Sequence, residues 1–316
     1  MDFLLLYNPF LKKTIFYSLT KEKLNHCNIQ LSNYKNNSTY YGYKKEGFNF
    51  NTESLEFISK DLVETTKSEY TNYLNAIFKC ISENQIKKVV AFRTKLEIKP
   101  KSFCPKRAFE SLKTNFPNTF VFWLYIKNEI QMMGASPEIV GILENKKFST
   151  YSLAGTISKN DHFSKKEYLE QEIVTDSINK ILSKYQSNVV VTPKKHFNFG
   201  DIKHILNQIE IEIESKDFKN IIKEIHPSAA LSGFPKNEAI DFINQNEPQN
   251  RTFYTGLCHQ IIEDDKQYAF AFLRCFEIFE KDLLFYAGGG IINDSDIETE
   301  WNETERKINS IKSIVM

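Results

Sequence analysis

The sequence predicts an α+β fold built on antiparallel sheets. Strand-like segments in the middle of the chain follow one another as hairpins, and similar segments return near the C-terminus. Helical segments interrupt the hairpins, but strands and helices do not alternate regularly, which disfavours a parallel α/β sheet. The 316 residues contain no long Pro/Gly/Ser-rich linker and no short-period repeat, so we expect one domain spanning residues 1–316.

The first part of the chain is weakly patterned before a helix and a strand. Residues 1 to about 60 are polar and tyrosine-rich, and we expect a variable portion in which 31–51 forms an exposed loop or an edge hairpin. Residues 89–98 are strand-like. A helix is predicted over 64–83, where six residues share one apolar stripe: Tyr70, Tyr73, Leu74, Ile77, Phe78 and Ile81.

The middle of the chain predicts two hairpins and a helix. The hairpins turn at 127–128 and at 144–147, and they pair 119–126 with 129–133 and 138–143 with 148–153. The helix covers 165–182 and directs five apolar residues to the core: Ile173, Val174, Ile178, Ile181 and Leu182. Strands return at 268–279 and 283–286, with a turn at 280–282.

The stretch after the last strand is the most informative one. Gly288, Gly289 and Gly290 carry no Cβ, so a ligand can approach the backbone there. Ser295 then has the pattern of a helix N-cap, with Glu298 completing a capping box.

On the C-terminal helix, Glu300, Glu303 and Lys307 are spaced at i, i+3 and i+7 and therefore share one face. Two carboxylates and an ammonium near bare backbone could hold a divalent cation together with an anionic substrate. A solvated helix face stabilised by ion pairs is the competing explanation.

Composition and charge exclude several classes of protein. A net charge of +1 gives no general attraction to nucleic acid or anionic lipid. The apolar run at 3–6 is too short for a signal peptide or a membrane span. The odd number of cysteines, without CxxC spacing, indicates a reducing compartment and no zinc site: Cys27, Cys80, Cys104, Cys258 and Cys275. We therefore expect a soluble cytoplasmic protein, and a monomer.

Polar residues also stand where other predicted strands begin or end. Lys88 starts a buried strand, Glu138 follows a tight turn, and Gly155 with Thr156 ends a strand where backbone N–H groups can bind an anion. Taken singly, these features have ordinary explanations: Lys88 as a solvated lysine, the turn before Glu138 as a common turn, and the dipeptide His226-Pro227 as a capped loop. Four further segments are EQEIVTD (170–176), IHPSAALSGFP (225–235), EPQNRTFYTG (247–256) and LRC (273–275).

Together and in this order, the motifs resemble the chorismate-utilising enzyme family, which includes isochorismate, salicylate, anthranilate and aminodeoxychorismate synthases. The resemblance covers about 86–316, and its most specific parts are GASPE, LAGT, HPSAALSGFP and YAGGGI followed by EWNETERK. It implies a single domain of two stacked antiparallel sheets flanked by helices, with the active site in a cleft between the sheets. It also implies chorismate as the substrate and Mg²⁺ as the cofactor.

The same resemblance implies the metal ligands. The family's metal carboxylates match Glu170 and Glu303, and Glu300 matches a neighbouring acid that supports the metal or its waters. Mg²⁺ prefers hard oxygen ligands, keeps several waters and takes few protein carboxylates. The family commonly has Glu-His where this chain has Glu170-Gln171, and the stretch before Glu170 is shorter than usual. Glu172 is the nearest alternative ligand, but it faces another side of the helix.

The resemblance also implies the reaction. Isochorismate and salicylate synthases carry a water-activating lysine that matches Lys88, and anthranilate synthases tend not to have it. Aminodeoxychorismate synthases of the well-studied type carry a lysine where this chain has Ala154. Water is therefore the expected nucleophile, and no amidotransferase partner is expected. Glu138 matches the general acid, which has to be protonated at working pH and so needs an apolar or anionic setting.

The remaining expected contacts come from the same motifs. The ring carboxylate of chorismate is expected to contact Gly155, Thr156, Gly288 and Lys307. The enolpyruvyl carboxylate is expected to contact Tyr254, Arg274 and the backbone of Gly256, because Arg suits a planar anion. His226 is expected near the ring, orienting the substrate or its C4 hydroxyl, and Ala230 with Leu231 forms an apolar wall beside it.

The leading hypothesis is an isochorismate synthase that supplies menaquinone or a catechol siderophore. A salicylate synthase would use the same residues and also eliminate pyruvate. Two further hypotheses are an ammonia-using anthranilate or aminodeoxychorismate synthase component and a non-catalytic paralogue that binds chorismate. The N-terminal portion shows no match to the family's tryptophan-binding element, so feedback by tryptophan is not expected.

Overall fold

The structure is a computed structural model that describes residues 1–23, 26–46 and 55–316. The helices are α1 (Lys67–Ser82), α2 (Pro105–Asn115), α3 (Lys165–Leu182), the short 3₁₀ turn η1 (Ser215–Asp217), α4 (Phe218–Ile225), α5 (Lys236–Asn246) and α6 (Ile297–Val315). The strands are β1 (Phe3–Asn8), β2 (Lys13–Thr20), β3 (Ile29–Ser32), β4 (Thr39–Lys45), β5 (Lys88–Ile98), β6 (Phe120–Ile126), β7 (Ile130–Ser136), β8 (Ile139–Glu144), β9 (Lys147–Ser158), β10 (Val190–Val191), β11 (Lys195–Phe199), β12 (Ile202–Glu212), β13 (Gly233–Phe234), β14 (Leu257–Glu263), β15 (Lys266–Ala271), β16 (Cys275–Ile278) and β17 (Asp282–Ile291).

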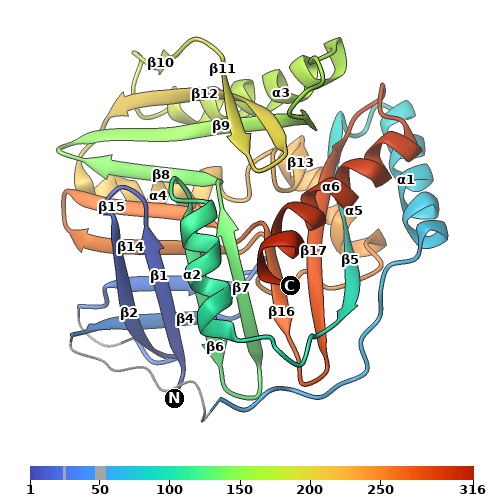
Figure 1. Ribbon diagram of the computed structural model, residues 1–316. Coiled ribbons are helices and arrows are strands. Elements are labelled where there is room, and N and C mark those ends of the chain that lie inside the picture. The colour runs from blue at the N-terminus through green and yellow to red at the C-terminus, as the bar shows by residue number, and fades with distance from the viewer. Residues whose placement is uncertain (24–25, 47–54) are drawn as a thin grey trace.

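Antiparallel pairing joins these strands into one continuous sheet. The order is β11–β12–β9–β8–β15–β14–β3–β4–β2–β1–β6–β7–β16–β17–β5–β13, and β10 also pairs with β12. Figure 1 shows β9 and β12 crossing above the steeper strands β7, β16 and β17. The predicted α+β class with antiparallel strands is confirmed, and the two stacked layers are parts of one folded sheet.

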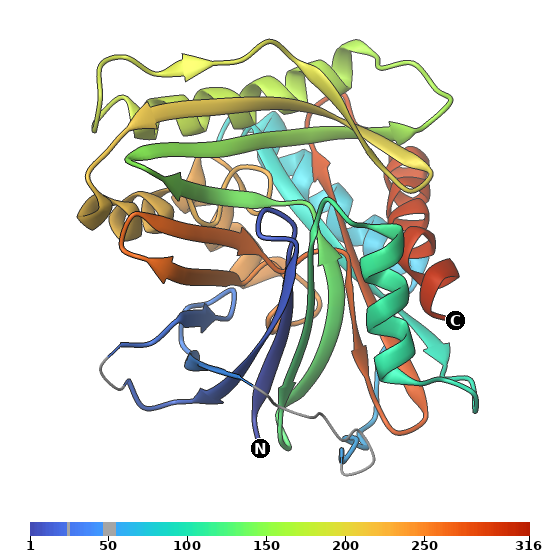
Figure 2. The same cartoon turned by 60° about the vertical axis from the view of Figure 1, so that its left-hand side comes forward.

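A hydrophobic core lies between two parts of the folded sheet, one that contains β6 and β7 and another that contains β8 and β15. One cluster of buried side chains combines Leu124 of β6 and Met132 of β7 with Ile142 of β8 and Phe270 of β15. Burying a side chain of this size contributes roughly 1.5–3 kcal/mol, so contacts between the two parts stabilise the fold of the sheet. Figure 2 shows the sheet turning from the upper strands into the lower ones.

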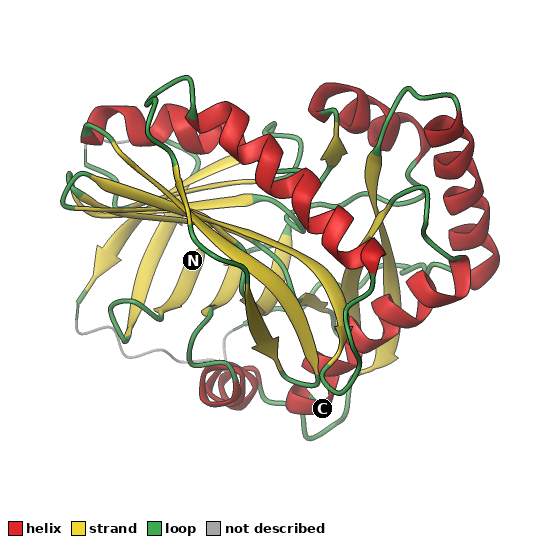
Figure 3. Cartoon of the chain, turned by 90° about the horizontal axis from the view of Figure 1, so that it is seen from above, coloured by secondary structure: helices red, strands yellow, loops and turns green. Residues whose placement is uncertain are grey.

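The helices lie along the periphery of the molecule (Figure 3). The predicted helix over 64–83 is confirmed as α1, which begins after a capping box formed by Thr66 and Glu69. The predicted helix over 165–182 is confirmed as α3, which begins after a capping box formed by Ser164 and Glu167. Among the described residues, no helix is long and apolar enough to cross a membrane.

Two expectations about the N-terminal portion were incomplete. Strands β1 to β4 are integral to the sheet, because β1 pairs with β2 and β6, and β4 pairs with β2 and β3. The hairpin expected at the sheet edge within 31–51 is internal, because β3 also pairs with β14. Residues 47–51 of that expected hairpin lie outside the described residues. The pairing partners are distant in sequence, so weak local periodicity gave no sign of them.

Two local predictions near the C-terminus were wrong in detail. The N-cap of α6 is Asp296, whose side chain accepts the backbone N–H of Thr299 at 2.9 Å, and Ser295 instead donates to Glu300 at 2.7 Å. The strand predicted over 268–279 is divided into β15 and β16. Arg274, which lies between them, has φ +49°, a left-handed conformation that interrupts extended backbone.

Candidate active site

Most of the predicted site residues meet in one cleft. Strands β9 and β12 line one side of this cleft, and β17 and α6 line another. The cleft is lined by nine of the predicted residues: Glu138, Thr156, Glu170, Ala230, Leu231, Tyr254, Arg274, Gly288 and Lys307. Thr255 and Leu273, which belong to two of the motif segments, also line it, and so does His204, which the sequence did not single out. Segments that are far apart in the sequence therefore converge on one concave place, which is typical of a ligand site.

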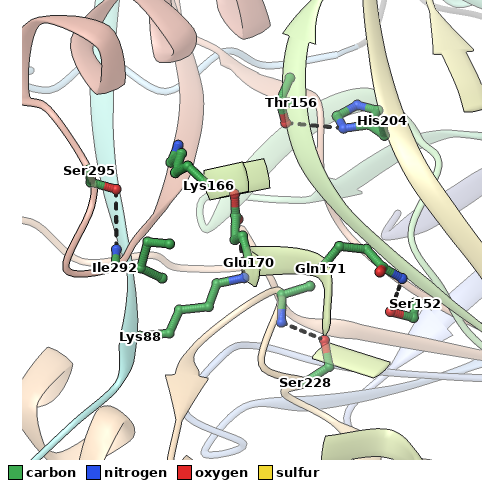
Figure 4. Close-up of polar contacts among 12 residues, drawn as sticks. Lys88, Ser152, Thr156, Lys166, Glu170, Gln171, His204, Ser228, Ile292 and Ser295 are labelled. Atoms are coloured by element: carbon green, nitrogen blue, oxygen red, sulfur yellow. Dashed lines mark hydrogen bonds and ion pairs between the residues drawn. The ribbon is translucent and has the colours of Figure 1, made fainter. Parts of the chain in front are cut away.

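Strand pairing places Lys88 beside Glu170. Lys88 begins β5, which pairs with β17 so that Gly290 lies opposite Val90. The buried Lys88 Nζ lies 3.1 Å from Glu170 Oε1, and Figure 4 shows the two side chains meeting from different elements. A Cβ at Gly290 would lie 2.1 Å from Glu170 Oε1 and 2.6 Å from Lys88 Cε. The glycine therefore makes room for two functional side chains of the protein itself.

Glu170, Glu300 and Glu303 form a buried carboxylate cluster. Glu300 Oε1 lies 2.7 Å from Lys166 Nζ, and Glu303 Oε1 lies 2.5 Å from Lys307 Nζ. Lys307 Nζ also donates to the carbonyl of Gly288 at 2.8 Å. The predicted common face of Glu300, Glu303 and Lys307 is thus confirmed as an inward face, and not a solvated one.

The charges in this cluster influence one another strongly. Burial, and then the nearby Glu303, raise the pKa of Glu300 to about 7. Burial also acts to raise the pKa of Glu303, but the ammonium groups of Lys307 and Lys166 outweigh it and lower that pKa. Protons and cations therefore compete for the same carboxylates.

Two carboxylate oxygens of the cluster have no hydrogen-bond donor among the residues that the structure describes and are suited to a hard divalent cation. Glu170 Oε2 and Glu300 Oε2 are buried and receive no hydrogen bond from the described residues, an arrangement that is costly unless a ligand interacts with them. Within the described ranges, no three acidic, His or Cys side chains converge as a closed metal-ligand set. Mg²⁺ commonly takes only one or two carboxylates and keeps its waters, so Glu170, Glu303 and Glu300 could hold it.

Glu138 is a buried carboxyl group with a raised pKa. It follows Pro137, and its backbone carbonyl accepts the N–H of Ala271 at 3.1 Å. Burial raises its pKa to about 8, against the lowering influence of Lys88, Ser228 and Arg274. Glu138 is therefore predominantly protonated at neutral pH, which is the state that the general-acid role implied by the resemblance would require.

His204 connects two of the predicted substrate contacts. Arg274 Nη2 lies 2.9 Å from His204 Nε2, and His204 Nδ1 lies 3.1 Å from Thr156 Oγ1. A guanidinium can only donate, so Nε2 is the acceptor and the ring proton resides on Nδ1, which donates to Thr156. Burial, followed by Arg274 and Lys307, lowers the pKa of His204 well below its usual value, so the ring is neutral.

The sequence carried no signal that could have identified His204. It stands in an ordinary alternating strand, and it meets Thr156 only because β12 pairs with β9, with a bulge between His204 and Ile205. Such bulges re-aim side chains near functional sites.

Three predicted contacts are not on the lining of the cleft. Gly155 has φ +64°, and its Cβ position lies 2.8 Å from the carbonyl of Glu167, so it allows close packing against α3. The N–H of Gly256 already donates to Phe253 at 2.8 Å, so it is not free for a carboxylate. His226 is buried, neither of its ring nitrogens finds a partner among the described residues, and burial followed by Lys236 lowers its pKa to about 3.

The residues that depart from the expected metal motif have structural explanations. Gln171, where a histidine was expected, donates to Asn207 at 2.5 Å and to Thr175 at 2.8 Å. It thereby ties α3 to β12. The alternative ligand Glu172 is exposed and pairs with Lys194 at 2.9 Å, away from the cluster, whereas Glu170 faces inward.

The family profile described as "Chorismate binding enzyme" matches residues 14–316, which is nearly the whole chain. The chain belongs to this chorismate-binding family. The match begins at residue 14, well before the region of about 86–316 that contains the motifs. Strands β3 and β4 and nearly all of β2 therefore lie within the family match, whereas β1 precedes it.

Among curated relatives, the chain is 25% identical over 262 residues to isochorismate synthase MenF of Escherichia coli, covering 79% of this chain and 60% of that protein. It is 23% identical over 270 residues to anthranilate synthase component 1 of Aquifex aeolicus, covering 79% and 53%. The matched segments therefore span only about half of the length of these relatives. These relatives are named for different reactions, and their identity to this chain is low. The reaction of this chain therefore has to be inferred from its own residues.

Solved structures support the fold. A structure described as a 2,3-dihydroxybenzoate-specific isochorismate synthase, DhbC from Bacillus anthracis, superposes with a TM-score of 0.82 at 19% identity, covering 99% of this chain and 95% of that one. The menaquinone-specific isochorismate synthase MenF of Escherichia coli also gives 0.82, at 18% identity, with 100% and 89% coverage. The chorismate-binding fold predicted from the motifs is confirmed.

Proposed function

We propose that the protein is an isochorismate synthase, which converts chorismate to isochorismate in an Mg²⁺-dependent reaction. The observation that carries this proposal is the presence of two buried ionisable groups near one cleft, Glu138 on its lining and Lys88 behind Glu170. Glu138 has a pKa raised to about 8, and Lys88 lies close enough to influence that pKa. A protonated acid and an amine base beside one cleft suit the protonation of a leaving hydroxyl together with the deprotonation of water.

Lys88 would take a proton from the water whose oxygen bonds to C2 of chorismate. Glu138 would give its proton to the C4 oxygen as the C4–O bond breaks, so the hydroxyl leaves as water. One water is added and one is lost, and the product is an isomer of the substrate.

The metal would supply electrostatic stabilisation. Bound at Glu170 and Glu303, with Glu300 in support, Mg²⁺ would hold the ring carboxylate and offset negative charge during the displacement. This assignment is supported by Glu170 Oε2 and Glu300 Oε2, the two buried oxygens that lack a donor within the described part of the chain.

The lining residues would orient the substrate. Thr156 and Lys307 would bind the ring carboxylate beside Gly288. Arg274, whose buried Nη1 contacts no acceptor of the described residues, would bind the enolpyruvyl carboxylate together with Tyr254. Ala230 and Leu231 would form the apolar side of the ring site. Such a wall would help to stop the reaction before pyruvate is lost.

Water is proposed as the nucleophile because Lys88 is present and Ala154 stands where a lysine would favour aminodeoxychorismate formation. The proposal therefore requires no amidotransferase partner. Its product could supply a menaquinone or a catechol siderophore route, since MenF is described as menaquinone-specific and DhbC as 2,3-dihydroxybenzoate-specific.

The test is to incubate the protein with chorismate and Mg²⁺, with and without ammonium, and to resolve the products by chromatography and NMR. Isochorismate in both samples without stoichiometric pyruvate supports the proposal. Salicylate with pyruvate would instead indicate a salicylate synthase. An amino product that depends on ammonium would refute water as the nucleophile. The absence of turnover would indicate a paralogue that only binds chorismate.

Two variants test the assigned roles. Lys88→Ala and Glu138→Gln should each abolish turnover while circular dichroism still shows a folded protein. The melting temperature of Lys88→Ala should fall, because Glu170 loses its buried partner. Lys87→Ala is a matched control, because Lys87 is the exposed neighbour of Lys88. Near wild-type rates in Lys88→Ala or Glu138→Gln would show that the acid–base assignment is wrong.

A further inference from the structure

Lys166 has no role in the proposed reaction, although its side chain lies inside the carboxylate cluster. It is the second residue of α3, and its side chain is 11% exposed. Its Nζ lies 2.7 Å from Glu300 Oε1, and the charges of Glu170 and Glu303 also act on it. Figure 4 shows Lys166 and Lys88 near Glu170.

Each of the three carboxylates in the cluster lies beside one lysine of the described residues. Lys88 pairs with Glu170 and Lys307 pairs with Glu303, while Lys166 pairs with Glu300. Buried carboxylates without such partners would repel one another and would carry a large desolvation cost.

Lys166 differs from the other two lysines because it can leave the cluster. Lys88 is fully buried at the start of β5, and Lys307 is held by both Glu303 and the carbonyl of Gly288. Lys166 stands in the first turn of α3 beside the exposed Lys165, and a flexible four-carbon stem carries its ammonium.

We propose that Lys166 is a resident cation that balances the carboxylate cluster in the metal-free protein and leaves it when Mg²⁺ binds. This inference rests on the proposed metal site. A divalent ion at Glu170 and Glu303 would repel an ammonium within hydrogen-bond distance of Glu300. The two cations therefore compete, and Lys166 sets the concentration of Mg²⁺ that the protein requires.

The first test measures Mg²⁺ binding by calorimetry and by thermal shift, without substrate. Lys166→Gln should lower the Kd for Mg²⁺ about tenfold or more, because binding no longer displaces a charge. It should also lower the melting temperature of the metal-free protein and enlarge its rise on adding Mg²⁺. The matched control Lys165→Gln, on the exposed neighbouring lysine, should behave as the wild type in both measurements.

The second test follows Lys166 in the wild-type protein, so it does not depend on the folding of a variant. An amine-reactive reagent is applied with and without Mg²⁺, and labelled lysines are mapped by mass spectrometry. Labelling of Lys166 should increase several-fold with Mg²⁺, while that of Lys165 should not change. Unchanged or reduced labelling of Lys166 would overturn the displacement.

The outcomes separate this inference from the proposed function. If the wild type shows no Mg²⁺ binding at all, the metal site is wrong and this inference fails with it. If the wild type binds Mg²⁺ and Lys166→Gln binds it equally or more weakly, Lys166 is not a competing cation. The metal site and the isochorismate synthase proposal would then be unaffected.

Discussion

Replacing Gly290 with alanine tests whether the cleft depends on the positions of Lys88 and Glu170. The added Cβ would lie 2.1 Å from Glu170 Oε1 and 2.6 Å from Lys88 Cε, whereas ordinary contact begins at 3.4 Å. The carboxylate must therefore move by about 1 Å or more. A misplacement of this size in a catalytic group can cost about 100-fold in rate.

The same substitution should affect folding much less than catalysis. The atoms that would collide with the Cβ are near the ends of side chains, so the backbone pairing of β17 with β5 can persist. Overpacking of this kind costs about 1–3 kcal/mol. We therefore expect Gly290→Ala to be folded, with kcat for isochorismate formation reduced about 100-fold.

The assay is steady-state kinetics with chorismate, together with the melting temperature and circular dichroism of each variant. Gly289→Ala is the matched control on the same strand, because its Cβ would meet Glu300 Oε2 at 2.9 Å and its next neighbour, Glu303 Oε1, only at 3.7 Å. It should therefore lose less activity than Gly290→Ala. Near wild-type activity in a folded Gly290→Ala, or a larger loss in Gly289→Ala, would refute the reasoning.

The remaining predictions concern proton donation, metal binding and substrate orientation. Because Glu138 has to be protonated to act and its pKa is raised to about 8, kcat/KM should fall as the pH rises through about 8. A profile that stays flat to about pH 9.5 would contradict this role. Glu303→Ala should weaken the Mg²⁺ dependence of turnover, and an unchanged Mg²⁺ titration would move the site elsewhere. His204→Leu removes the acceptor for Arg274 and the donor to Thr156, so KM for chorismate should rise about tenfold with a smaller change in kcat. A loss confined to kcat would show that His204 does not orient the substrate.

Local signals in the sequence determined the elements that carry the site. Helix α3 covers Lys165–Leu182, the range that its apolar stripe predicts. Glu300 and Glu303 share an inward face, because helical periodicity depends only on spacing along the chain. The ordered motifs likewise identified the family, and they named most of the residues that line the cleft.

Only the tertiary structure decided which of these residues act together. His204 reaches Thr156 through the pairing of β12 with β9, and Lys166 meets Glu300 across more than a hundred residues of sequence. The three glycines were expected to admit a ligand, but Gly290 makes room for Glu170 and Lys88. Helices and turns are set by neighbours along the chain, whereas contacts between distant strands depend on register and burial across the whole sheet. The positions of charges relative to one another, and hence their pKa values, follow from those distant contacts.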